Sequence, residues 1–197
     1  VTLGGPVFDL VKLGWVNNQH MKLKDLGELT RLTIPFFVNE GYLTNENVSE
    51  KEFETLKKIV EIEREGAKTL KELAKNSKFF FVDEFSLPEV KEDMDKKERK
   101  SVERLLNSLK DEVGLKSIKL FIEKLEKWEG NEFTAEQAKD LLHSLLDDLQ
   151  EGPGKIFMPL RAVLTGATKG ADLYNILYVI GKERALKRIK DTVKKYN

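Results

Sequence analysis

Apolar residues recur at three- and four-residue spacing along nearly the whole chain, and this pattern restricts the possible fold more than any other feature. The clearest stripe consists of Leu141, Leu142, Leu145, Leu146 and Leu149. Such spacing places the apolar side chains on one face of an α-helix. Convincing alternation of apolar and polar residues, which is typical of a half-buried strand, is absent. The sequence therefore predicts an all-α protein with almost no sheet.

Local signals indicate where some of these helices begin or bend. Ser49 with Glu52, and Thr134 with Gln137, form the capping-box pattern. In this pattern a hydroxyl and a Glu or Gln three residues later satisfy the free N–H groups at a helix start. We also expect Pro35 to bend or restart the helix around it, because proline has no backbone N–H to donate.

An acidic segment with few apolar positions, residues 83–95, separates two stretches of strong helical periodicity. The segment also contains Pro88, and segments of this composition often mark the boundary between domains. We therefore expect two helical subdomains, residues 1–87 and residues 88–197.

Composition excludes several classes of protein. Hydrophobic residues make up 40% of the 197 residues, which is enough for a packed core. The chain has no cysteine, so disulfide scaffolds and thiolate metal sites are excluded. No apolar run approaches the ~20 residues that a membrane-spanning helix needs, and we expect no signal peptide. We expect a soluble protein that does not contact a membrane.

The charges give a mixed indication about nucleic acid. Lysine plus arginine number 34, and aspartate plus glutamate also number 34, so no global field attracts phosphate. The segment from Lys182 to Lys195 is locally basic, with seven cations against Glu183 and Asp191. A basic helix face either follows a phosphate backbone or is an ordinary solvated surface. The sequence leaves both interpretations open.

The residues that often carry chemistry have ordinary explanations here. The run at 152–155, Gly-Pro-Gly-Lys, lacks the preceding strand and the following Ser or Thr of a P-loop, and it favours a tight turn between helices. His20 and His143 have no partner pattern for metal binding or acid–base catalysis. Trp15 and Trp128 are expected in the core. We expect no catalytic residue and no metal ligand in this chain.

The segment from Lys155 to Ile189 combines a Met-Pro-Leu-Arg helix start, a glycine-rich loop, a second helix, Gly181 and a basic helix. This order resembles the C-terminal end of bacterial-type glutamyl-tRNA synthetases, where it holds the anticodon loop. Residues 12–21, KLGWVNNQHM, are similar to the same family's lysine-leucine-tryptophan-asparagine signature. The HIGH-type and KMSKS-type motifs of the catalytic half are absent. The resemblance implies a two-part helical cage that binds the anticodon and lacks the catalytic site.

The resemblance also implies which residues contact tRNA. Arg161 matches the arginine that reaches the anticodon bases, and its planar fork of donors suits base edges and stacking. Gly170, Ala171 and Leu173 match positions that pack against the first anticodon base, through backbone groups and an apolar contact. Contacts with the RNA backbone are expected from Arg64, Lys68 and Lys169.

Gly66 lines up with the position that contacts the third anticodon base, where relatives restricted to glutamate tRNA carry arginine. Glutamate anticodons end in C, and glutamine anticodons end in G. Arginine donates to the O2 and N3 acceptors of C, whereas the pairing edge of G presents N–H donors that oppose it. Glycine has no side-chain donors, so this discrimination between C and G is lost. The loss implies tolerance of, or preference for, glutamine tRNA. An alignment shifted by two residues would place Arg64 there instead.

For the full enzyme, the resemblance implies glutamate–tRNA ligase activity that needs ATP and Mg²⁺, while this chain needs no cofactor. It implies tRNA(Glu), tRNA(Gln) or both as partners, a cytoplasmic location and a monomeric chain. The alternative function is a helical protein-interaction module without RNA binding. Neutral charge and leucine stripes allow this alternative, but it leaves the Arg161 block unexplained.

Overall fold

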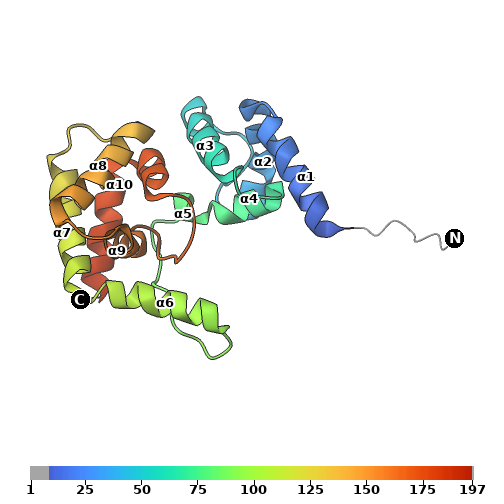
Figure 1. The fold of residues 1–197 in the computed structure, drawn as a ribbon. Helices are drawn as coiled ribbons and strands as arrows, with labels where there is room; N and C mark the ends of the chain where they lie inside the picture. Colours follow the sequence, from blue (N-terminus) through green and yellow to red (C-terminus); the bar gives the residue numbers. More distant parts are fainter. Residues whose placement is uncertain (1–8, 197) are drawn as a thin grey trace. The chain divides into compact units, whose positions relative to one another are not determined.

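The computed structural model describes residues 9–196, and within this range it contains ten α-helices and no strand (Figure 1). The prediction of an all-α protein is therefore confirmed. The helices of the first half are α1 (Leu10–Leu23), α2 (Leu26–Asn39), α3 (Glu50–Glu63), α4 (Leu70–Asn76) and α5 (Lys78–Phe81). Those of the second half are α6 (Lys96–Ser108), α7 (Glu112–Lys127), α8 (Ala135–Leu149), α9 (Pro153–Thr165) and α10 (Leu173–Tyr196).

The chain divides into two compact units after Phe81, which we call the N-terminal and C-terminal units. The composition of the acidic segment predicted this division later, between residues 87 and 88. Residues just after Phe81 belong with the second unit because they are tied to its last helix. The Asp83 carboxylate pairs with arginines of α10, and the backbone N–H of Leu87 donates to the hydroxyl of Tyr196 at 2.9 Å.

In the N-terminal unit, α2 packs against α3 and α4. Its core includes Phe37, which is fully buried and lies 5.1 Å from the ring of Phe81 between centroids. The capping box of Ser49 and Glu52 is present at the start of α3. Pro35 lies inside the continuous helix α2, and the chain breaks earlier instead, where Asp25 caps the start of α2.

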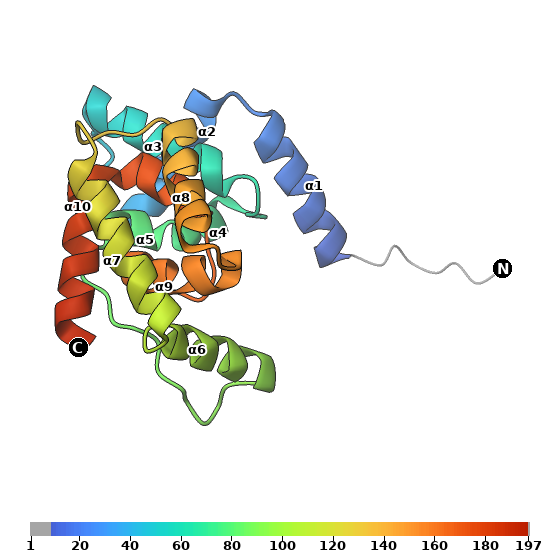
Figure 2. The ribbon, with the colours of Figure 1, turned by 60° about the vertical axis from the view of Figure 1, so that its left-hand side comes forward.

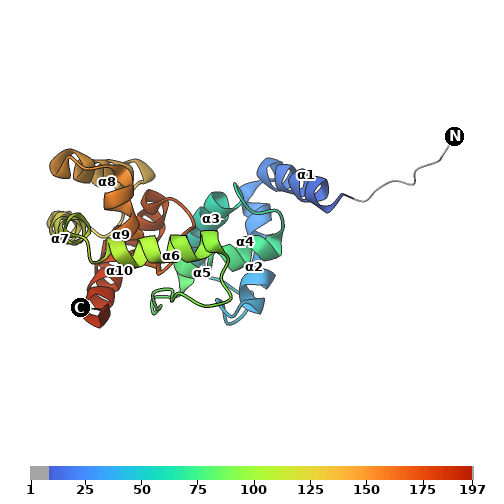
Figure 3. The same cartoon turned by 60° about the horizontal axis from the view of Figure 1, so that its bottom comes forward.

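The C-terminal unit is built around α7, α9 and α10, with α8 packed on α7 and α10 and α6 packed on α9 (Figures 2 and 3). The capping box of Thr134 and Gln137 begins α8, as expected. In the expected stripe of α8, Leu141, Leu142 and Leu145 are buried, whereas Leu146 and Leu149 are half-buried. The helical periodicity of the sequence therefore marks the buried face of this helix correctly.

Helix α10 consists of two helical segments that meet at Gly181, whose φ is 71° and ψ is 177°. The second segment is capped by Asn131. The backbone carbonyl of Asn131 accepts from the N–H of Lys182, and its Oδ1 accepts from the N–H of Glu183, both at 2.8 Å. A side chain at Gly181 would place Cβ 2.8 Å from the Asn131 carbonyl oxygen, so this close approach requires glycine.

The two tryptophans differ in burial. Trp128 is half-buried, and its ring packs against Phe133 at 4.9 Å between centroids. Trp15 is 61% exposed, so the prediction that it lies in the core is wrong. Helical spacing shows that Trp15 is on α1, but it does not show which face of α1 is covered. None of the helices in the range 9–196 is long and apolar enough to cross a membrane.

Candidate functional site

Residues 64–68, which we call the 64–68 segment, form a turn after α3. The turn is closed by the backbone N–H groups of Gly66 and Ala67, which donate to the carbonyl of Glu63 at 3.2 and 3.1 Å. Gly66 is exposed, and a Cβ added there would have no atom within 4 Å. The segment thus presents Gly66 as an open position on the surface of the N-terminal unit.

Arg64 and Lys68, on either side of Gly66, differ in exposure. Arg64 is half-buried, and its Nε is buried without a hydrogen-bond partner. Lys68 is exposed, and its backbone N–H donates to Oε2 of Glu72 at 2.8 Å. The side chain of Lys68 is accessible to a phosphate group, whereas the guanidinium of Arg64 is partly withdrawn from solvent.

Glu63 is a buried carboxyl group beside this segment, and the sequence analysis did not single it out. Glu63 is the last residue of α3 and is 9% exposed, and its Oε1 has no hydrogen-bond partner. Burial raises the pKa of Glu63 from its ordinary value of 4.5 to about 7, because the charged form loses its hydration. A glutamate at the end of a charged helix has no sequence signal that separates it from its solvated neighbours.

Arg161 lies near the end of α9 and reaches the loop that precedes α10. Its Nη1 donates to the backbone carbonyl of Ala171 at 2.9 Å, and its side chain is half-buried. Burial lowers the pKa of the Arg161 guanidinium, while the negative charge of Asp172 acts in the opposite direction. Arginine nevertheless stays protonated in proteins. The structure therefore holds a charged planar donor group against the loop.

The loop between α9 and α10, residues 166–172, depends on two glycines. Gly166, with φ of 64°, ends α9, and a Cβ there would lie 2.5 Å from the ring of Phe85. Gly170 has φ of 141° and is exposed together with Lys169. The loop therefore offers backbone groups at Gly170 and a cation at Lys169 to a ligand.

Leu173 is the first residue of α10, and its side chain is part of the core of the C-terminal unit, at 5% exposed. The family resemblance implies an apolar contact between Leu173 and a base, but the Leu173 side chain faces inward. Ala171 is half-buried and Gly170 is exposed. The structure thus brings Arg161, Gly170 and Ala171 together at one loop and leaves little of Leu173 at the surface.

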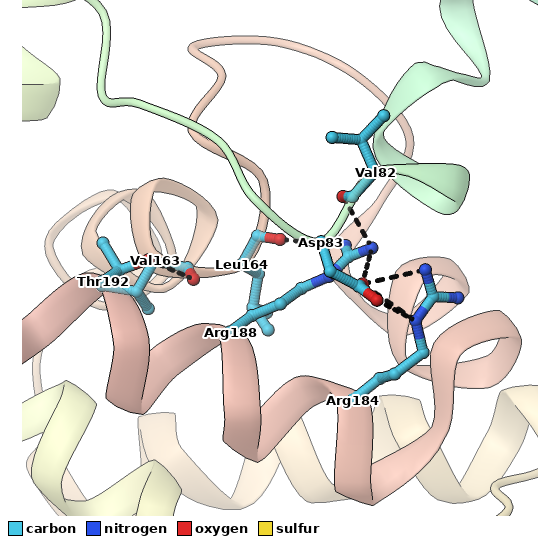
Figure 4. A network of polar contacts seen from close by, with 7 residues as sticks. All are labelled: Val82, Asp83, Val163, Leu164, Arg184, Arg188 and Thr192. Carbon is cyan, nitrogen blue, oxygen red and sulfur yellow. Dashed lines mark hydrogen bonds and ion pairs between the residues drawn. The ribbon is translucent and has the colours of Figure 1, made fainter. Parts of the chain in front are cut away.

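The two arginines of the basic C-terminal helix converge on Asp83 (Figure 4). Arg184 Nε donates to both carboxylate oxygens of Asp83, at 2.9 and 3.1 Å. Arg188 is 1% exposed, and its Nε donates to Oδ1 of Asp83 at 2.9 Å. Its Nη1 and Nη2 donate to the carbonyls of Leu164 and Val82, at 3.1 and 3.0 Å. Every guanidinium nitrogen of Arg188 is therefore engaged inside the unit.

Arg188 fits neither interpretation of the basic segment, because its side chain is buried and is not a solvated surface. Arg188 has no exposed donor for a phosphate, and its role is structural. Burial raises the pKa of Asp83, but the hydrogen bonds and charges of Arg184 and Arg188 outweigh it, so the pKa lies below its ordinary value. Lys190 of the same helix pairs with Glu126 at 2.6 Å. No sequence pattern links Asp83 to arginines 101 and 105 residues later.

Within residues 9–196, no group of three or more His, Cys, Asp or Glu side chains is arranged to hold a metal ion. His20 and His143 are both exposed, on different helices. The polar groups that stand out are therefore those of the 64–68 segment and of the loop at Arg161.

Comparison with known proteins gives consistent matches. Residues 28–193 match the family described as the anticodon binding domain. The glutamate–tRNA ligase of Fusobacterium nucleatum subsp. nucleatum is 93% identical over 197 residues, which are 100% of this chain and 39% of that protein. The glutamate–tRNA ligase of Carboxydothermus hydrogenoformans is 34% identical over 183 residues, or 93% of this chain and 35% of that protein.

A solved structure agrees with these matches. The crystal structure of a glutamate tRNA ligase from Elizabethkingia meningosepticum, in complex with its amino acid, gives a TM-score of 0.71 at 26% identity. The match covers 100% of this chain and 34% of that one. The chain therefore spans well under half the length of the proteins that it matches.

Proposed function

Because the chain belongs to the anticodon-binding domain family, in the form found in glutamate–tRNA ligases, we propose that it selects and positions tRNA by binding the anticodon. The partner is tRNA(Glu), tRNA(Gln) or both. The longer enzyme joins glutamate to this tRNA with ATP and Mg²⁺, through catalytic residues outside this chain. The chain acts in the cytoplasm, as a monomer, and without a cofactor of its own.

The observation that carries this proposal is the position of Arg161. Its guanidinium is half-buried, forms no ion pair with any residue in the range 9–196, and donates a hydrogen bond to the carbonyl of Ala171 in the loop. An arginine that only balanced a charge would lie against a carboxylate. Here one donor fixes the guanidinium beside exposed backbone at Gly170, and its remaining donors suit base edges and stacking in a single-stranded loop.

The N-terminal unit supplies the proposed contact with the third anticodon base. By resemblance, relatives restricted to glutamate tRNA carry arginine where this chain has Gly66. The open surroundings of Gly66 suit a base-contacting position, whereas the partly buried side chain of Arg64 suits it less well. This difference favours the alignment at Gly66 over the shifted one. We therefore propose that the enzyme accepts tRNA(Gln).

The direct test is binding of the chain to tRNA(Glu) and tRNA(Gln) transcripts at several salt concentrations. We expect weak binding with a modest salt slope, because each neutralised phosphate contributes roughly −0.7 to −0.9 to the slope. Replacing Arg161 with alanine should weaken binding by about 1–3 kcal/mol, the usual scale for a base contact.

The matched control is Lys155→Ala, on the same helix. Lys155 is exposed and forms an exposed ion pair with Glu151, four residues earlier, so its loss should change binding little. Absence of any salt-dependent tRNA binding at low ionic strength would refute the proposed function. Unfolding of the C-terminal unit by Arg161→Ala, with no separate effect on RNA, would refute the role of Arg161.

A further inference from the structure

One face of α1 lies along the 64–68 segment. Gly14, Asn17, Asn18 and Lys22 share this face, because residues three, four and eight positions apart lie on the same side of a helix. Each of them contacts the segment. The hydrogen bonds of the two asparagines join residues that are 46 to 51 positions apart in the sequence.

Asn18 makes the central contact, and it is buried at 9% exposed. Its single side-chain amide donates to the carbonyl of Arg64 at 2.9 Å and to the carbonyl of Ala67 at 2.7 Å. These two carbonyls bracket Gly66. A buried amide that satisfies two carbonyls fixes both peptide groups at once, because neither can rotate without losing a buried hydrogen bond.

Three further contacts extend this arrangement to both ends of the segment. The side-chain amide of Asn17 donates to the carbonyl of Lys68. The aliphatic part of Lys68 lies against Gly14, where an added Cβ would be 3.0 Å from Lys68 Cδ. The ammonium of Lys22 pairs with Glu65 at 2.8 Å. Residues of α1 therefore contact four of the five residues in the segment.

Apolar burial contributes little to the position of α1. Its buried residues are Asn18 and Met21, while Leu10, Val11 and Leu23 are exposed. A helix attached mainly through apolar packing would show the reverse pattern. The polar contacts with the 64–68 segment are thus the principal attachment of α1 that the structure shows.

We propose that Asn17 and Asn18 are positioning residues that set specificity at the third anticodon base. The inference rests on the proposed function, in which this base meets the 64–68 segment. Gly66 has no side chain, so the placement of its main chain decides which base edge it can meet. Binding sites need such placement to within about half an ångström. Asn18 of α1 fixes this placement by donating to the carbonyls of Arg64 and Ala67, which precede and follow Gly66 in the segment.

The test uses Asn18→Asp, which keeps the shape of the side chain but replaces the donor amide with an acceptor facing two carbonyls, and Asn17→Ala. The control is His20→Ala, an exposed residue on the same helix. One readout is hydrogen exchange of the Gly66 and Ala67 amides in the free chain. We expect exchange about 10-fold faster in Asn18→Asp, because two buried hydrogen bonds are lost, and no change in His20→Ala.

The second readout is binding of two anticodon stem-loop RNAs that differ only in C or G as the third anticodon base. It is measured in the wild-type and Gly66→Arg backgrounds. We expect Gly66→Arg to favour the C-containing RNA, and Asn18→Asp to reduce that preference roughly 5-fold or more, within the range for one base contact. His20→Ala should leave the preference unchanged.

Unchanged exchange in a folded Asn18→Asp chain would overturn the inference. Faster exchange with an unchanged preference in both backgrounds would also overturn it, because the segment would then be held without affecting base choice. Failure of the wild-type chain to bind either RNA would instead refute the proposed function, and the inference with it. The wild-type measurement therefore separates the two failures.

Discussion

Each of the two units buries an ionisable side chain, but the surroundings of these two side chains differ. In the C-terminal unit, Arg188 is 1% exposed and meets a carboxylate and two carbonyls. In the N-terminal unit, Glu63 is 9% exposed and its Oε1 has no partner. Arginine cannot lose its proton, so its burial requires partners, whereas a carboxyl group can be buried in its protonated form. The stability of the C-terminal unit therefore depends on a specific ion pair, and the stability of the N-terminal unit depends on pH.

The largest effect should follow from removing the partner of the buried arginine. Asp83→Ala leaves the buried Arg188 charged and without its carboxylate, and because Asp83 itself is half-buried we expect a loss toward the lower end of the about 3–5 kcal/mol that breaking a buried pair costs. Urea unfolding, with hydrogen exchange to locate the change, should show the loss in α9 and α10. The control is Glu126→Ala, which breaks the exposed pair with Lys190 and should cost about 1 kcal/mol or less. Equal losses for the two variants would contradict the structural role of Asp83.

The second effect concerns Glu63 and depends on pH. Its pKa is raised from 4.5 to about 7 in the folded chain, so this stabilising contribution is fully present below pH 4.5 and is lost as the pH rises through about 7. The loss is on the order of 3 kcal/mol, at about 1.4 kcal/mol for each tenfold change in proton affinity. Glu63→Gln should remove this pH dependence, so that the variant is the more stable protein at pH 8.

The free energy of unfolding measured from pH 5 to pH 8 checks this prediction. Glu61→Gln, an exposed neighbour on α3, is the matched control and should follow the wild type. Parallel curves for the wild type and Glu63→Gln would show that Glu63 is already ionised in the folded chain at pH 5. In that case Glu63 would not make the stability of the N-terminal unit depend on pH, and the contrast with the C-terminal unit would be refuted.

The glycines extend the comparison to the backbone. Gly181→Ala in the C-terminal unit combines a φ of 71° with a Cβ 2.8 Å from the Asn131 carbonyl oxygen. We expect a loss of about 1–3 kcal/mol, the cost of a strained backbone position. Thermal unfolding measures the loss, and Gly154→Ala, whose Cβ would meet nothing within 4 Å, serves as the control. Similar stability of both variants would show that the kink at Gly181 can relax.

The smallest effect on stability is expected at Gly66, where no atom would meet a new side chain and φ is outside the left-handed region. Gly66→Arg should change the free energy of unfolding by roughly 0.5 kcal/mol or less, as is usual for a surface substitution that neither strains the backbone nor meets a neighbouring atom. Its effect should appear in function, as a shift of charging by the full-length enzyme toward tRNAs whose anticodon ends in C. An unchanged ratio of charging efficiencies on the two tRNAs, with the variant folded, would refute the role of this position.

Local chemistry was sufficient for much of the fold. Helical spacing predicted the all-α class, and the capping boxes at Ser49 and Thr134 begin α3 and α8. Recognition of the Arg161 block predicted the family, which the comparisons confirm. These predictions depend on residues that are close in the sequence or that occur in a fixed order, so the amino-acid sequence contains them directly.

The sequence by itself thus determined the helical class, the starts of α3 and α8 and the family, but the tertiary structure decided which polar groups face solvent. Arg188 belongs to a basic run and is buried, because the Asp83 carboxylate approaches from the start of the unit. Asn18 is a polar residue on α1 and is buried, because its amide meets carbonyls of the 64–68 segment. The burial of these side chains depends on residues that are far away in the sequence. Neither composition nor helical spacing shows which distant residues come into contact.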